Sequence, residues 1–238
     1  MKNISSKELI NILKSLKDSD SFQEMQAINV MSNLKVIGVR VPVLKNLTYE
    51  YAKKGVQVNF SKETDKYFEA VLLEGFIISL DTDKNSVKQK LNAYYQKMDN
   101  WAASDMVCAS LDAFKKGGDE DDFVYFANLL NSENPWVVRF GIVALIKFFM
   151  NEQFVSRVLE VAYKVKSEHQ YVNMALAWLV SEVMALNPST SDKTIKSIIK
   201  TNNFSRSIIN KGIQKCLDSM RFTDKKKEKL RALKIKRW

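Results

Sequence analysis

Apolar residues recur at spacings of three and four along almost the whole chain. This period matches one face of an α-helix, whereas a half-buried strand would alternate at every second residue. The pattern predicts roughly a dozen helices of about 10 to 16 residues each. It is clearest in six groups: Leu9, Ile10, Leu13 and Leu16; Tyr67, Phe68, Val71, Leu72 and Phe76; Phe123, Phe126, Leu129 and Leu130; Val138, Ile142, Leu145 and Phe149; Val158, Val161 and Ala162; and Ile208, Ile209, Ile213 and Cys216.

Glycine and proline are scarce, with 7 and 3 residues in the chain. A β-sandwich or barrel needs more turns than these residues could mark, so an all-α fold is favoured. Pro42 and Pro135 stand where a first helical turn would begin, and Ser21 with Glu24 resembles a capping box. Helix pairs of this size repeat about every 35 to 45 residues in HEAT-type arrays. We expect an α-α superhelix of HEAT-like antiparallel pairs, forming a curved solenoid with a concave basic face.

No linker rich in Pro, Gly or Ser divides the chain. Residues 1–238 are therefore expected to form one continuous HEAT-like repeat domain. Its last segment, about 224–238, is an unusually basic tail. A like-charge run at a terminus is most often a frayed, solvated helix.

The chain has 37 Lys and Arg against 27 Asp and Glu, a formal net charge of +10. The average field of such a protein attracts polyanions, so nucleic acid is the first partner to consider. A lysine-rich surface that is merely solvated would give the same balance, so charge alone leaves the partner open.

Composition also suggests a compartment. The start Met-Lys-Asn-Ile-Ser-Ser lacks the apolar core of a secretory signal, and no apolar run approaches the length of a membrane span. Cys108 and Cys216 lie in apolar helical patterns without metal-ligand spacing, which is typical of buried thiols in a reducing compartment. We expect a cytoplasmic monomer that binds neither membrane, metal nor other cofactor.

Common catalytic signatures are missing from the sequence. There is no glycine-rich phosphate loop, paired-cysteine motif or HExxH, and the one histidine, His169, has no catalytic constellation around it. Any chemistry must come from aromatic residues, carboxylates and arginines.

Three tryptophans have a charged residue at helical spacing. Trp101 and Asp105 share one helix face at i, i+4, Arg139 follows Trp136 by one turn, and Glu182 follows Trp178 likewise. Core packing is the ordinary role of a tryptophan in a helical repeat. Asp105 resists that interpretation, because an unpaired carboxylate among apolar neighbours costs several kcal/mol to bury, about 1–3 or more. It therefore faces a cleft, meets Arg139 or caps a neighbour.

Four short motifs occur in order along the chain: Gly-Val-x-x-Pro at Gly38 to Pro42, Asp-x-Trp-x-x-x-Asp at Asp99 to Asp105, Asn-x-Trp-x-x-Arg at Asn134 to Arg139, and Ala177-Trp178. Ser205-Arg206 then precedes a basic amphipathic helix with Lys211 and Lys215. Together these motifs span most of the chain. Their order resembles the AlkD-type DNA glycosylases of the HEAT-like repeat superfamily.

That family removes cationic N3- and N7-alkylated purines from duplex DNA. The resemblance implies that Trp101 and Trp178 contact the deoxyribose, while Asp105 stabilises positive charge on the sugar and positions a water. The DNA-binding residues that it implies are Arg139, which would hold a phosphate, Trp136, Arg206, Lys211 and Lys215. The chemistry is reasonable, because an alkylated purine is already a cationic leaving group and needs no general acid.

Active relatives usually have a short helix with a Tyr-Met pair and basic neighbours ahead of Gly-Val-x-x-Pro. This chain has Asn29-Val30-Met31-Ser32-Asn33 there, so it resembles a divergent paralogue branch that lacks the usual N-terminal DNA-contacting motif. Two functions stay open: an alkylpurine DNA N-glycosylase, which is a hydrolase of DNA repair, and a non-catalytic or very weakly active DNA-binding HEAT-repeat protein. Both predict duplex DNA as the partner and, when DNA-bound, association with the nucleoid. A pure protein-interaction solenoid is the third alternative.

Overall fold

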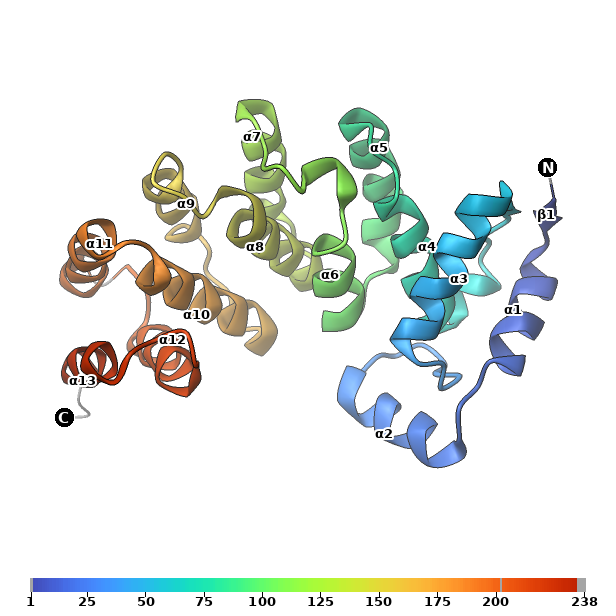
Figure 1. Ribbon diagram of the computed structural model, residues 1–238, viewed down its shortest axis with the longest axis horizontal. Helices are drawn as coiled ribbons and strands as arrows, with labels where there is room; N and C mark the ends of the chain where they lie inside the picture. The colour runs from blue at the N-terminus through green and yellow to red at the C-terminus, as the bar shows by residue number, and fades with distance from the viewer. Residues whose placement is uncertain (1, 202, 235–238) are drawn as a thin grey trace. The chain divides into compact units, whose positions relative to one another are not determined.

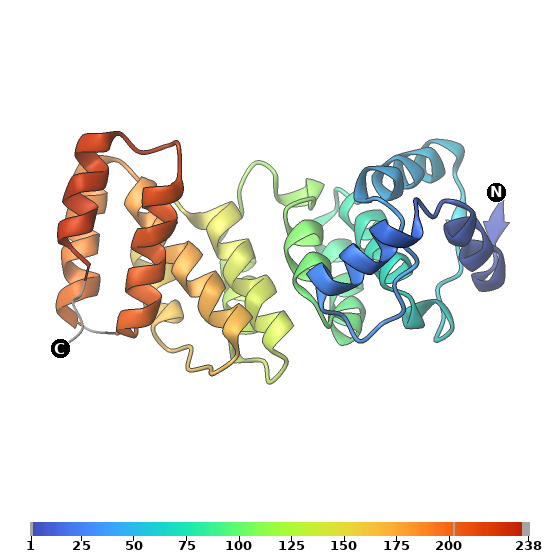
Figure 2. The same ribbon diagram turned by 90° about the horizontal axis from the view of Figure 1, so that it is seen from below.

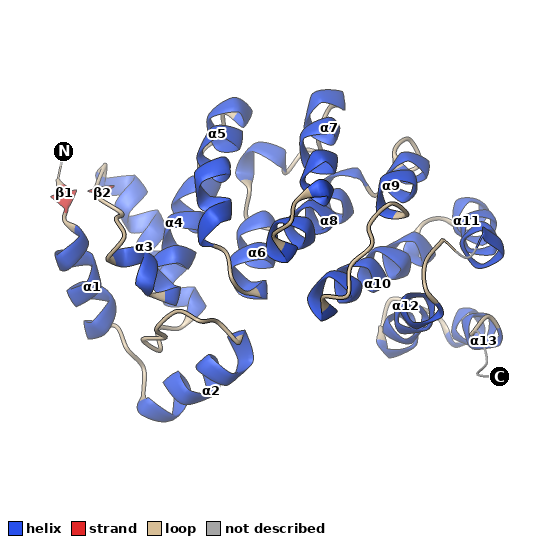
Figure 3. Ribbon diagram, turned by 180° about the vertical axis from the view of Figure 1, so that it is seen from behind, coloured by secondary structure: helices blue, strands red, loops and turns tan. Residues whose placement is uncertain are grey.

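The structure is a computed structural model in which residues 2–201 and 203–234 are described. Within these ranges the chain forms thirteen α-helices, four short 3-10 helices and two strands of two residues each (Figures 1 and 3). The predicted all-α fold is confirmed. The α-helices are α1 (Ser6–Ser15), α2 (Asp20–Val30), α3 (Val41–Lys54), α4 (Phe68–Ser79), α5 (Lys84–Tyr94), α6 (Trp101–Cys108), α7 (Glu120–Asn128), α8 (Pro135–Phe149), α9 (Val155–Ala162), α10 (Gln170–Ala185), α11 (Pro188–Thr201), α12 (Arg206–Asp218) and α13 (Asp224–Ala232). The strands are β1 (Asn3–Ile4) and β2 (Gln57–Val58), which pair in parallel.

The helices form two compact units, unit 1 up to Lys115 and unit 2 from Lys116 onwards. Each unit has its own buried core and is described by itself. The division falls just before Gly117-Gly118, and Gly117 adopts a positive φ of 92°. The single continuous domain expected from the sequence stays a prediction.

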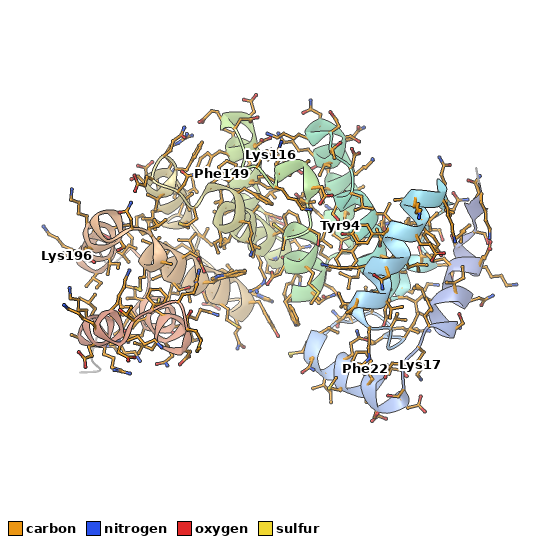
Figure 4. The ribbon with its side chains drawn as sticks, in the orientation of Figure 1. Lys17, Phe22, Tyr94, Lys116, Phe149 and Lys196 are labelled. Carbon is orange, nitrogen blue, oxygen red and sulfur yellow. The ribbon has the colours of Figure 1, made fainter. Side chains whose placement is uncertain are left out.

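Helix α4 is the centre of unit 1, and α1, α3, α5 and α6 pack against it. Ten of its twelve residues are buried, which explains why the sequence of α4 is apolar on every side. Gly75 permits this close packing, because an added Cβ would lie 2.4 Å from Val107 and 2.8 Å from the Tyr94 hydroxyl. Tyr94 is completely buried in this core (Figure 4).

A single buried carboxylate from α4 holds the loop that leads into α3. Glu69 accepts hydrogen bonds from the backbone amides of Ile37, Gly38 and Val39 at 2.7 to 3.2 Å. Gly38 has a φ of 95°, and a Cβ there would meet Gln23 at 2.8 Å. The Gly-Val-x-x-Pro motif therefore has a structural explanation: only glycine fits the turn that presents three amides to Glu69.

In unit 2 the helices α8, α10 and α12 stack side by side. An earlier residue of α8 contacts an earlier residue of α10, and a later one contacts a later one: Arg139 binds Tyr171, and Lys147 lies over Trp178. Likewise, Gly212 of α12 approaches Ala177, and the later Cys216 contacts Ser181. The three helices are therefore parallel, as equivalent helices of successive helix pairs would be. Figure 2 shows α13 alongside α12 at the end of this stack.

Aromatic rings fill the first part of unit 2. Phe149 lies at the centre of this cluster (Figure 4), within 5.5 Å of the rings of Phe123 and Phe154, measured between centroids. Both cysteines are buried, as the sequence suggested. Burial raises the pKa of Cys216 to about 12, so this thiol stays protonated and unreactive.

Prolines and capping side chains mark the helix ends more closely than the apolar spacing does. Pro42 and Pro135 lie in the first turns of α3 and α8, as predicted. The capping box proposed at Ser21 and Glu24 is wrong, since Ser19 caps α2 by accepting a bond from the Phe22 amide. The basic tail forms α13, and positions 235–238 of that tail lie outside the described residues.

Candidate nucleic-acid interface

In unit 1, Trp101 and Asp105 lie one turn apart on the same face of α6, and both side chains are partly exposed. Asn100 caps this helix: it is completely buried and accepts a hydrogen bond from the Ala103 amide at 3.0 Å. The other face of α6 packs against α4 through Ala102, Ala103 and Val107. Asp105 is therefore on the solvent side of a firmly anchored helix, and a carboxylate there can act on a bound ligand.

The segment after α2 is bound directly to the start of α6. The indole Nε1 of Trp101 donates to the Asn29 carbonyl at 2.9 Å. Asp99 accepts hydrogen bonds from the Ser32 hydroxyl at 2.8 Å and the Asn33 amide at 2.6 Å. Residues 29–33 are thus neighbours of Trp101. Helix α2 exposes Met25 and Ile28, and Met31, which follows the helix, is exposed as well.

In unit 2, Arg139 and Trp136 lie at the start of α8 and face the start of α10. Arg139 is only 7% exposed, and its Nη1 donates to the Tyr171 carbonyl at 2.6 Å. The Trp136 ring packs against the rings of His169 and Tyr171, with centroids 5.1 and 5.0 Å apart. This contact gives His169 a packing role.

Trp178, two turns further along α10, belongs to a different polar cluster. Its Nε1 donates to Glu182 Oε1 at 3.0 Å, and Arg221 holds both oxygens of Glu182 at 2.7 and 3.0 Å. Lys147 lies 5.4 Å from the indole ring centroid. Burial alone would raise the pKa of the Glu182 carboxyl, but hydrogen bonds from Arg221 and Trp178 outweigh it, and the pKa lies below its ordinary value.

The ion pair between Arg221 and Glu182 fixes the orientation of the Trp178 indole, and this can be tested by replacing Arg221 with methionine. We expect the indole N–H resonance of Trp178 to move, and the pKa of Glu182 to rise because only Trp178 and Lys147 then oppose the effect of burial. The measurement is a ¹⁵N–¹H NMR titration with pH. Arg157→Met is the matched control, since Arg157 makes an equally bidentate pair with Glu120 in unit 2. If both variants leave the Trp178 resonance in place, the ion pair between Arg221 and Glu182 does not orient the indole.

The predicted basic residues of α12 are exposed. Arg206, Lys211 and Lys215 project from this helix, whose opposite face buries Ile209 and Ile213. Arg206 and Lys211 line a hollow of about 430 Å³ together with Ser207, Asn210, Gln214 and Lys234. The structure thus brings Arg206 and Lys211 together in one basic hollow that a phosphate group can enter.

Comparison with known proteins adds the family. A model of the DNA alkylation repair enzyme family matches residues 9–216. The chain belongs to this family. No curated protein and no solved structure matches it. The matched range includes every predicted site residue, from Trp101 to Lys215, and most of both units.

No described helix is both long and apolar enough to cross a bilayer. No cluster of three or more His, Cys, Asp or Glu in the described part of the chain could hold a metal ion.

Sequence reasoning placed Glu182 one turn after Trp178, but it found neither Arg221, which binds Glu182, nor Asn29, the partner of Trp101. Arg221 is 39 residues from Glu182, and Asn29 is 72 residues from Trp101. Neither pair leaves a local signal in the sequence.

Proposed function

We propose that this protein binds duplex DNA and hydrolyses the N-glycosidic bond of cationic N3- and N7-alkylpurines, with Asp105 as the catalytic carboxylate. The observation that supports this most directly is the partly exposed pair of Trp101 and Asp105 on one face of α6. An indole and a carboxylate side by side favour a sugar that becomes positively charged as the base leaves.

In this proposal no general acid is needed. The alkylated purine leaves as a neutral base, taking the electron pair of the glycosidic bond. Positive charge then develops on the deoxyribose, where Asp105 stabilises it and orients a water molecule that attacks C1′ and loses its proton to solvent. Trp101 and Trp178 contact the sugar, and Arg139, Trp136, Arg206, Lys211 and Lys215 contact the DNA. Trp101 donates its N–H to Asn29 and Trp178 donates its own to Glu182, so both indoles are held by protein acceptors.

A second function is favoured by the position of Arg139. This guanidinium is 7% exposed and binds the Tyr171 carbonyl, so its first role is to join α8 to α10. If its contact with a phosphate is weak, the protein would be a non-catalytic or weakly active DNA-binding member of the family.

An excision assay separates the two functions. Duplex DNA containing 7-methylguanine or 3-methyladenine is incubated with the protein, and the released base is measured against the spontaneous rate. Release above that rate supports the glycosylase, whereas its absence together with salt-dependent duplex binding supports the non-catalytic function. If log affinity does not change with log salt concentration, phosphate binding is excluded and both functions fail.

A further inference from the structure

A hollow of about 160 Å³ lies in unit 1, between α3, α4 and the turn that follows α6. Helix α3 contributes Lys45 and Tyr49, α4 contributes Phe76, and the segment after α6 contributes Ser110, Asp112 and Lys115. None of these residues is part of the site described above. A water molecule occupies about 30 Å³, so the hollow can hold a small anion and a few waters.

The charge of this hollow is positive. Its lining has two ammonium groups, Lys45 and Lys115, against one carboxylate, Asp112. Asp112 is already paired with Lys115 at 2.6 Å. Lys45 has no carboxylate partner among the described residues, and its Nζ lies 5.1 Å from the ring centroid of the buried Phe76. One partly buried positive charge is therefore left without an anion.

The hydrogen-bonding groups also favour an anion. The hydroxyls of Thr48 and Ser110 donate to the backbone carbonyls of Leu44 and Met106, at 2.9 and 2.8 Å. Donors that face a ligand here include the ammonium of Lys45 and the phenol of Tyr49, a residue that is 58% exposed. A ligand rich in acceptor oxygens matches these groups. A cation would be repelled by the ammonium of Lys45.

The hollow continues the α6 face that presents Trp101 and Asp105. Ala109, which lines it, follows Asp105 by four residues and donates its amide to the Asp105 carbonyl at 2.9 Å. Four residues of helix correspond to about 6 Å along the axis. A strand whose sugar lies at Asp105 would therefore bring a neighbouring phosphate close to Lys45.

We infer that this hollow is a phosphate-binding site organised by Lys45, and that its phosphate belongs to the duplex strand lying along α6. The second half of this inference rests on the proposed function. Inorganic phosphate and a backbone phosphate share the same recognition chemistry, so separate experiments distinguish the two sources. The site would supply a DNA contact in unit 1, where residues 29–33 lack the aromatic and basic residues of the resembled family.

The first experiment uses inorganic phosphate as the probe. Sodium phosphate is titrated into the full chain against sodium chloride of equal ionic strength, while the backbone amides of Ala109, Ser110 and Asp112 are followed by NMR. We expect these amides to shift, with a Kd of about 1 mM. Lys45→Met should weaken binding at least about fivefold, because methionine still covers Phe76 but has no charge, and Lys45→Arg should retain it. Lys53→Met, an exposed lysine on the same helix, is the matched control. Amides that do not respond in the unmodified protein overturn the inference.

The second experiment measures duplex affinity between 50 and 200 mM salt. One lost phosphate contact lowers the slope of log affinity against log salt by about 0.9, so Lys45→Met should lose about 3.5-fold less affinity over this range. Lys53→Met should keep the slope of the unmodified protein. If phosphate shifts the hollow's amides but Lys45→Met leaves the slope unchanged, the backbone-phosphate assignment is wrong. If the unmodified protein binds no duplex, the proposed function fails, and the phosphate titration still decides the site.

Discussion

Replacing Asp105 by asparagine is expected to lower alkylpurine excision at least about a hundredfold, to near the spontaneous rate. Asparagine has almost the same shape and keeps a hydrogen-bond acceptor, but it lacks the negative charge that stabilises the cationic sugar. Loss of one preorganised electrostatic contact typically costs about 10² to 10³ in rate. The measurement is single-turnover release of 7-methylguanine from a defined duplex.

The same substitution should affect binding in the opposite direction. Asp105 is a negative charge on the face that is proposed to meet a polyanion, so its removal should leave duplex affinity unchanged or raise it. A purely structural carboxylate would behave differently, since its loss would lower the melting temperature and reduce binding and excision together.

The matched control is Asp121→Asn, which removes one exposed carboxylate from the first turn of α7. It changes the net charge equally and should leave excision within about twofold, because exposed surface charges act weakly through solvent. Excision by Asp105→Asn at the unmodified rate would remove Asp105 from the mechanism.

The sequence predicted the helices well because most of them bury one apolar stripe. Helix α9, for example, buries Val158 and Ala162 on one face, as their spacing indicated. Errors arose where capping decides the boundary. Ser19 and Ser21 are equally good caps by residue type, and the contacts of the folded chain select Ser19.

The candidate site was only partly predictable. Trp101 and Asp105 were placed on one face correctly, because i, i+4 spacing is a property of any helix. Their surroundings depend on long-range contacts, such as the bond from Trp101 to Asn29, for which periodicity contains no information. The Lys45 hollow was missed for the same reason, since its lining comes from α3, α4 and the segment after α6.

The contribution of Glu69 to stability was equally hard to predict from the sequence. In the sequence it is one charged residue in an apolar helix, and in the structure it is fully buried and accepts bonds from three consecutive amides. No feature of the sequence near Glu69 identifies these donors, which lie 30 to 32 residues earlier. The glycine at position 38 is the only local sign of an unusual turn.

Replacing Glu69 by alanine is expected to destabilise unit 1 by about 3 to 5 kcal/mol, because three buried amides lose their acceptor and a cavity remains. This corresponds to a fall in melting temperature of roughly 10 °C for a chain of this size. Hydrogen exchange at Ile37, Gly38 and Val39 should accelerate most, since their donors are released directly. Urea unfolding monitored by circular dichroism gives the energy, and exchange by NMR gives the location.

The pH dependence of this loss has a definite sign. Burial raises the pKa of Glu69 above its ordinary value, although the three amides partly oppose the shift. The native state therefore holds its proton to a higher pH than the unfolded chain, and the stability that Glu69 contributes declines as pH rises through the raised pKa. Glu69→Ala should accordingly be more destabilising at pH 4 than at pH 8. Glu63→Ala, which removes an exposed partner of Lys66, is the control and should change stability by less than about 0.5 kcal/mol. Equal unfolding midpoints for the two variants would show that the loop into α3 does not depend on Glu69.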